Sequence, residues 1–182
     1  CECTGAAPPP STPVPPPATP VPPPPTKVEH IYDNESGAFA TSHQQDAWQR
    51  YEEAGGEHYG GSHAFNRQLG TGQDVATWSF SVPKPGRYAV YAWWWGGEWR
   101  PADVPYVING SAGPRTVRVN QQVNGGKWNL LGVVEFEGPG SVAVKDDATS
   151  GQDVVADAVG LTYVAPPSSM FPWRVYLSVI KH

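Results

Sequence analysis

The sequence predicts an all-β domain, a sandwich or a barrel, between a proline-rich N-terminal segment and a short apolar C-terminal segment. Two observations predict this fold class. Segments rich in Val, Thr, Tyr and Trp alternate with Gly or Pro at short intervals, as in many short strands joined by turns. The prolines are also unevenly distributed, because 12 of the 21 fall between Pro8 and Pro25. No apolar run approaches the roughly 18 residues of a membrane-spanning helix, so we expect none.

Residues 1–27 are expected to form a proline-rich arm or stalk. Thr12–Ala18 (TPVPPPA) is nearly repeated as Thr19–Pro25 (TPVPPPP). Proline fixes φ and lacks an N–H group, so this segment is restricted to polyproline II or coil. It acts either as a spacer or as a stalk that carries O-glycans, with Ser11, Thr12, Thr19 and Thr26 as the acceptors.

The two cysteines, Cys1 and Cys3, both lie in the arm, so the domain is not held together by a disulfide. No leader peptide is visible, and a mature secreted chain or a cytosolic chain would both fit that observation. In a secreted chain, Cys1 could carry a lipid, join another chain or have no role.

Residues 28–164 are expected to form the folded domain from successive short strands. Thr77–Val82 alternates apolar and polar residues, and Pro83–Gly86 forms the next turn. Alternation resumes from Tyr88 to Trp95. Further strand segments are expected at residues 107–108, 117–119, 130–136, 142–144 and 154–164. Asp46 to Ala54 is expected to form one or two helical turns inside a long loop.

One segment carries a family resemblance. Thr116 to Gly132 reads TVRVNQQVNGGKWNLLG, a strand, a tight Gly-Gly turn and a second strand. It resembles the golvesin C-terminal-like domain, a module also described from xanthan lyases. The resemblance covers residues 28–164. Further matching segments within this range are residues 33–34, 88–93, 100–106 and 154–159. The resemblance implies an extracellular, non-catalytic domain with two antiparallel sheets in a jelly-roll-like sandwich, often described as carbohydrate-binding. Val119, Trp128, Leu130 and Val159 are expected in its core.

Residues 165–182 lie beyond the usual end of that family and are expected to form an extension strand. In an extended conformation one face would carry Trp173, Val175, Leu177 and Val179. Such an apolar strand must be buried, either on an edge of its own sheet or on the sheet of a neighbouring subunit.

The sequence predicts no enzyme. Gly60–Ala64 (GGSHA) resembles a nucleophile elbow around Ser62, but Ala64 replaces the final glycine. His58 and His63 have no third metal ligand nearby in the sequence. Adjacent carboxylates, such as Asp146 and Asp147, point to opposite sides of a strand and do not form an acid/base pair. The formal net charge of −5 argues against nucleic acid as a partner.

Aromatic residues are the strongest chemical signal, with 8 Trp and 8 Tyr in the chain. Sugar rings stack on indoles while amides and carboxylates bind their hydroxyl groups. Strand alternation predicts that Trp94 faces opposite to Trp93 and Trp95. A carbohydrate-binding surface is therefore expected from Trp94, Trp99, Arg100, Asp103, Asn120, Gln121 and Gln122. The alternative is that the tryptophans pack the sandwich or a subunit contact.

Calcium is the one cofactor that we consider. Sugar-binding sandwich modules commonly hold a structural Ca²⁺ between the first and last strands, and Glu29, Asp33 and Asp157 are the expected oxygen ligands. The alternative is that Asp33 and Asp157 make turn and backbone hydrogen bonds. Asn34 and Asn109 also fit the N-glycosylation pattern.

Two functions remain open. The first is an extracellular or cell-surface structural subunit of a bacterial filament or surface assembly, in which terminal arms join copies of the chain into a homopolymer. Contact with a membrane would then come only through a lipid on Cys1. The alternative is a carbohydrate-binding module that recognises polysaccharide through surface aromatics. We expect the first, because it accounts for the arm and the extension strand.

Overall fold

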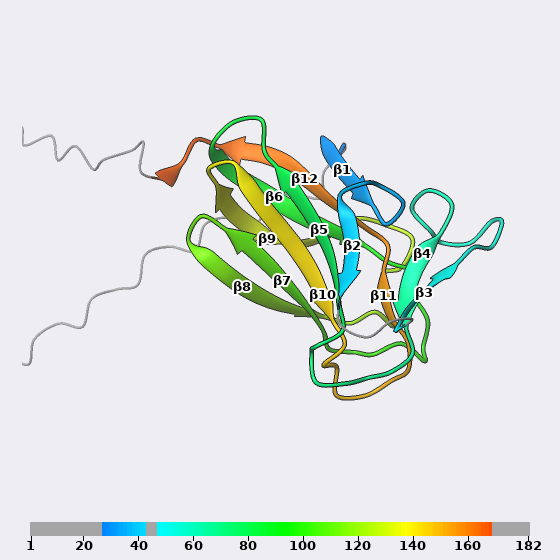
Figure 1. Cartoon of the computed structure of the whole chain (residues 1–182). Helices are drawn as coiled ribbons and strands as arrows, with labels where there is room; N and C mark the ends of the chain where they lie inside the picture. Colours follow the sequence, from blue (N-terminus) through cyan, green and yellow to red (C-terminus); the bar gives the residue numbers. More distant parts are fainter. Residues whose placement is uncertain (1–26, 43–46, 169–182) are drawn as a thin grey trace, which may run out of the picture.

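The computed structural model describes residues 27–42 and 47–168, which form an all-β domain (Figure 1). The described part contains no helix that is long and apolar enough to cross a membrane. Most predictions for the arm, including the acceptors Ser11, Thr12, Thr19 and Thr26, lie outside the described residues. So do those for Cys1 and for the extension strand with Trp173, Val175, Leu177 and Val179.

The described residues contain twelve strands. They are β1 (His30–Asp33), β2 (Phe39–Ser42), β3 (Trp48–Tyr51), β4 (His63–Asn66), β5 (Val75–Ser81), β6 (Gly86–Trp93), β7 (Val104–Gly110), β8 (Gly113–Val119), β9 (Asn129–Phe136), β10 (Pro139–Lys145), β11 (Val154–Ala156) and β12 (Ala158–Ala165).

The strands form two main antiparallel sheets and one small sheet. The first sheet has the order β1-β12-β6-β9, and the second has the order β2-β5-β10-β7-β8. These two sheets lie face to face as the layers of the sandwich (Figure 1). The small sheet, β11-β4-β3, lies at one end, and the chain passes from it into the first sheet at Asp157, between β11 and β12. The predicted all-β jelly-roll-like sandwich is confirmed.

The core lies between the two main sheets, and strand alternation supplies its side chains. On β5, Ala76, Trp78 and Phe80 are buried, and the residues between them are more exposed. On β6, Tyr88 and Val90 enter the same core. Val159 of β12 is buried there as well, as the sequence predicted.

The first sheet has a second apolar cluster on its outer face. Ala89 and Tyr91 of β6 are buried there under Val28, with Trp128, Leu130 and Val133 partly buried around them. The prediction that Trp128 and Leu130 are buried in the core of the sandwich is therefore wrong, and Val119, which packs against that core, is also only half-buried. A bulge opposite Val90 and Tyr91 turns Leu130 outward, and Leu131 enters the main core in its place.

The helical turn predicted at Asp46–Ala54 is wrong for residues 47–54, the part that the structure describes. Trp48–Tyr51 is strand β3, which pairs with β4 so that Trp48 lies opposite Asn66 and Tyr51 opposite His63. The ladder to a distant strand supplies backbone hydrogen bonds that local pattern cannot reveal, and Trp and Tyr both favour strands.

Loops from several strands meet at one end of the sandwich, the lower end in Figure 1. Backbone hydrogen bonds join them, such as Gly70 N to Asp146 O at 3.0 Å and Gln152 N to Trp99 O at 2.9 Å. Away from this end, β8 forms the outer edge of the second sheet, and its exposed residues include Pro114, Arg115 and Arg118.

Candidate functional site

A pocket of about 290 Å³ lies between the small sheet and the loops that follow β6 and β10. Strands β3 and β4 and the neighbouring loops supply its lining. The lining residues are Tyr51, Glu53, His63, Phe65, Arg67, Trp95, Trp99, Arg100 and Asp153. We call this the aromatic pocket.

The aromatic side chains of this pocket form one packed group. The ring of Tyr51 lies edge-on to that of Trp95, with centroids 5.7 Å apart. Buried His63 and Phe65 pack beneath, with ring centroids 5.5 Å and 6.4 Å from that of Tyr51. Tyr51 is 42% exposed and Trp99 48% exposed, and they are the exposed aromatic residues of the described part of the chain. Both rings therefore offer apolar faces to a ligand.

Charged groups surround these rings. Arg100 Nη1 lies 3.2 Å from Asp153 Oδ2, and Arg67 Nε lies 4.0 Å from Asp153 Oδ1. Burial lowers the pKa of Arg100 and the Asp153 carboxylate raises it, and a guanidinium stays charged throughout the physiological range. The Arg100 guanidinium carbon lies 5.8 Å from the centre of the Trp99 ring. The pocket therefore combines ring faces with donors and acceptors for hydroxyl groups.

His63 belongs to a histidine pair beside the pocket. Its Nδ1 lies 3.0 Å from His58 Nδ1, so one imidazole donates to the other. Burial, followed by Arg100 and His58, lowers the pKa of His63 to about 3. His63 is therefore neutral at physiological pH. In the described ranges no group of three or more His, Cys, Asp or Glu residues is arranged to hold a metal ion.

The structure separates the residues that were predicted to form a carbohydrate-binding surface. Trp99 and Arg100 line the aromatic pocket, and Gln122 lies behind it, donating from Nε2 to Arg100 O at 3.0 Å. Trp94 does face away from Trp93 and Trp95, but it points into the main core and donates from Nε1 to Val123 O. A surface role for Trp94 is therefore wrong.

Gln121 is also misplaced by the sequence prediction, because its side chain is fully buried. Its amide makes two hydrogen bonds to the backbone of Val155 in β11, one through Oε1 at 2.9 Å and one through Nε2 at 2.8 Å. Neighbouring Asn120 is exposed, and its Oδ1 accepts from Gln122 N at 2.8 Å. Both residues shape the loop instead of facing the pocket.

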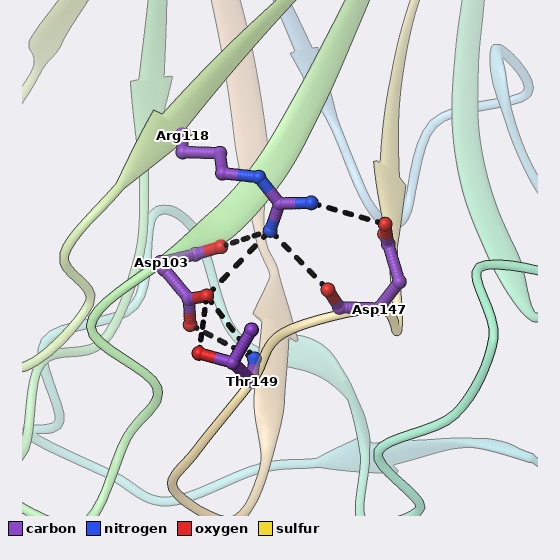
Figure 2. A network of polar contacts seen from close by, with 4 residues as sticks. All are labelled: Asp103, Arg118, Asp147 and Thr149. Atoms are coloured by element: carbon purple, nitrogen blue, oxygen red, sulfur yellow. Dashed lines mark hydrogen bonds and ion pairs between the residues drawn. The ribbon is translucent and has the colours of Figure 1, made fainter.

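Asp103 belongs to a separate polar network (Figure 2). Its carboxylate accepts from Thr149 N at 3.1 Å and from Thr149 Oγ1 at 2.7 Å. Arg118 Nη1 donates to Asp103 O at 2.8 Å, and Arg118 Nη2 donates to Asp147 Oδ2 at 3.1 Å. The Thr149 hydroxyl is the main cause that lowers the pKa of Asp103. Asp103 therefore joins loops and does not line the aromatic pocket.

Of the three expected calcium ligands, Asp33 and Asp157 lie close enough to interact electrostatically, and Glu29 lies apart from them. Glu29 Oε2 accepts from Tyr163 N at 2.9 Å, near the far end of the β1–β12 ladder from Asp33. Asp33 Oδ1 accepts from Glu35 N at 2.9 Å, and Asp157 accepts from Tyr59 N at 3.1 Å. The alternative, turn and backbone hydrogen bonds, describes both aspartates.

The predicted binding surface contained two of the lining residues, Trp99 and Arg100, and missed the other seven: Tyr51, Glu53, His63, Phe65, Arg67, Trp95 and Asp153. Tyr51 was hidden because its segment was interpreted as helical. Trp95 was missed because Trp94, on the opposite side of the strand, was expected to face the ligand.

The fold is shared with solved β-sandwich modules. A family 35 carbohydrate binding module from Clostridium thermocellum has the same fold, with a TM-score of 0.51, 12% identity and coverage of 73% of this chain and 98% of that one. The module CBM35 from Cellvibrio japonicus Abf62 gives a TM-score of 0.51 at 16% identity, over 76% of this chain and 97% of that one.

The chain belongs to the Golvesin C-terminal domain family, whose profile matches residues 30–163. A xanthan lyase of Bacillus sp. (strain GL1) is 32% identical over 107 residues, 57% of this chain and 12% of that protein. The structure of a Paenibacillus xanthan lyase matches with a TM-score of 0.66 and 33% identity, over 74% of this chain and 13% of that one. The chain therefore corresponds to a small part of each enzyme. The resemblance to this family is confirmed.

Proposed function

We propose that the domain is a non-catalytic carbohydrate-binding module and that polysaccharide binds in the aromatic pocket. One observation carries the proposal: Tyr51 and Trp99, the exposed aromatic residues of the described chain, line the same pocket. Aromatic faces stack on the C–H faces of sugar rings, and a few polar groups fix the orientation of the ligand. The fold shared with carbohydrate-binding modules and the relation to xanthan lyases support this function.

The chemistry around the pocket supports a binding role without catalysis. Ser62 is buried, and its hydroxyl donates to Glu35 Oε1 at 2.8 Å. The adjacent His63 pairs with His58, so it does not activate this serine. A module of this kind acts on extracellular polysaccharide, and we accordingly propose an extracellular or cell-surface location. No comparison supports a subunit of a homopolymeric filament, so binding becomes the preferred function.

Calorimetry and affinity electrophoresis against a panel of neutral and acidic polysaccharides, xanthan included, test the proposal. We expect binding to at least one polymer in the micromolar to millimolar range, and a loss of at least about tenfold in Trp99→Ala and Tyr51→Ala. Trp99→Phe should retain most of the binding because a ring face remains. Val164→Ala is the control, since Val164 is exposed but does not line the pocket. Equal binding by Trp99→Ala, Tyr51→Ala and the unchanged protein would show that the pocket is not the site.

A further inference from the structure

A second pocket, of about 220 Å³, lies in the loops at the same end of the sandwich. It is formed by the loop between β4 and β5 and by the residue that follows β10. The lining residues are Gln68, Leu69, Gly70, Thr71, Gln73, Asp74 and Asp146. We propose that this Asp74–Asp146 pocket binds a calcium ion, independently of glycan binding in the aromatic pocket.

The first support is a buried carboxylate with an unpaired oxygen. Asp146 is 2% exposed, and its Oδ1 has no hydrogen-bond partner among the described residues. A buried polar oxygen without a partner is costly, because it has lost water and gained nothing in exchange. A cation in the pocket that Asp146 lines would supply that partner.

The second support is a second acidic side chain in the same place. Asp74 also lines the pocket and is 4% exposed. Burial raises the pKa of Asp146, and the negative charge of Asp74 raises it further, while backbone N–H groups of Gly72 and Asp74 lower it. Two buried like charges repel each other, and a divalent cation between them would turn that repulsion into attraction.

The donor set selects the metal. Five of the seven lining residues carry side-chain oxygen, and neither His nor Cys is among them. Hard cations such as Ca²⁺ and Mg²⁺ prefer oxygen ligands, and zinc and copper prefer nitrogen and sulfur. Ca²⁺ accepts irregular sets of carboxylate, amide and carbonyl oxygens, whereas Mg²⁺ requires near-octahedral geometry. A pocket built from one irregular loop therefore suits Ca²⁺.

Gly70 shows that the loop closes tightly over the carboxylate. A Cβ atom at this position would overlap Asp146 Oδ2, so only glycine lets the backbone approach so closely. Gly70 N also donates to Asp146 O at 3.0 Å, which holds the loop against the end of β10. The loop is thus held against the Asp146 carboxylate.

The test is a calcium titration of the full chain after treatment with EDTA and dialysis. Calorimetry with CaCl₂ should show one site, and the melting temperature should rise with calcium concentration, as for any ligand of the folded state. Asp146→Asn and Asp74→Asn should each weaken calcium binding at least tenfold. Melting of both variants in EDTA separates a loss of calcium binding from a loss of the fold, because both variants should remain folded without calcium.

Two controls separate this site from others. Glu137→Gln changes an exposed carboxylate outside the pocket and should leave calcium binding unchanged. Asp157→Asn tests the other buried aspartate, and loss of calcium binding there with retention in Asp146→Asn would overturn the proposal. Hydrogen exchange tests the site in the unchanged protein, where calcium should protect the amides of residues 68–74. Protection confined to other segments, or no calcium binding at all, would also overturn the proposed site.

Discussion

At the scale of single residues, burial decides which side chains can bind a ligand and which stabilise the fold. Asp157 is fully buried where the chain passes from the small sheet to the first main sheet. Burial is the main cause that raises its pKa to about 9, with Asp33 and Glu35 adding to the effect and the Tyr59 N–H opposing it. Asp157 is therefore protonated in the folded domain at neutral pH.

This predicts a pH dependence of stability. Asp157 binds its proton in the folded state up to about pH 9, whereas an unfolded aspartate loses it near its model value of 3.8. The stabilisation of the folded state by protonated Asp157 is fully present below the unfolded-state pKa and is lost as pH rises toward 9. The free energy of unfolding should fall over this range by up to about 1.4 kcal/mol per pH unit. Asp157→Asn should flatten this slope because asparagine has no carboxyl group to titrate. The amide oxygen can still accept a hydrogen bond from Tyr59 N, so the fold should be kept. Urea unfolding from pH 5 to 8 in EDTA measures this pH dependence, with Glu137→Gln as the control. Equal slopes for Asp157→Asn and the unchanged protein would show that Asp157 is not its source.

At the scale of strands, the side chain of Gln121 makes the backbone hydrogen bonds that a neighbouring strand would make with β11. Strand β11 pairs with β4 along one edge, and on the other edge Gln121 bonds both the N–H and the carbonyl of Val155. Gln121 Nε2 also lies 3.3 Å from the Tyr106 hydroxyl. A primary amide matches the donor and acceptor of one backbone residue, so Gln121 completes the ladder as a strand would.

Adjacent glutamines provide a matched comparison of this effect. Gln121→Ala leaves a buried donor and a buried acceptor of Val155 without partners, and each should destabilise the domain by about 1–3 kcal/mol. Gln122→Ala removes one bond from an exposed side chain to Arg100 O and should cost less than about 1 kcal/mol. Denaturant unfolding measures both free energies, and similar losses for the two variants would show that Gln121 does not support β11.

Strand patterns show what the sequence can and cannot predict. Alternation correctly separated Trp94 from Trp93 and Trp95, because a period of two fixes relative orientation. It could not say which side faces the core, since that depends on the sheet packed opposite. The number of aromatic residues led to Trp99 and Arg100 as site residues, but Tyr51 enters the pocket only through the long-range pairing of β3 with β4. Pairing between distant segments is not encoded in local periodicity.

At the scale of the whole molecule, the described residues enclose their own core. Both main sheets and the cluster on the outer face of the first sheet are built from residues 28–168. The charged loop network of Figure 2 is also complete within this range. The domain should therefore need neither terminal segment to fold.

A truncated chain of residues 27–168 tests this independence. We expect a melting temperature within a few degrees of that of the full chain, the same β-type circular dichroism and unchanged polysaccharide affinity, because the core and the aromatic pocket are intact. Sedimentation of both chains would be compared at the same concentration. An unfolded fragment would show that a terminal segment completes the core. Assembly by the full chain alone would revive the filament hypothesis.

The exposed residues of β8 have a consequence for crowded conditions. Pro114 lacks an N–H, and the Arg115 side chain places a positive charge at an outer edge of the sandwich, while the charge of Arg118 is paired with Asp103 and Asp147. A second molecule that approached with the same edge would meet an incomplete row of donors and the charged Arg115 side chain. If the domain binds polysaccharide as proposed, copies bound close together on one polymer chain would not pair through this edge, and their spacing would follow the polymer.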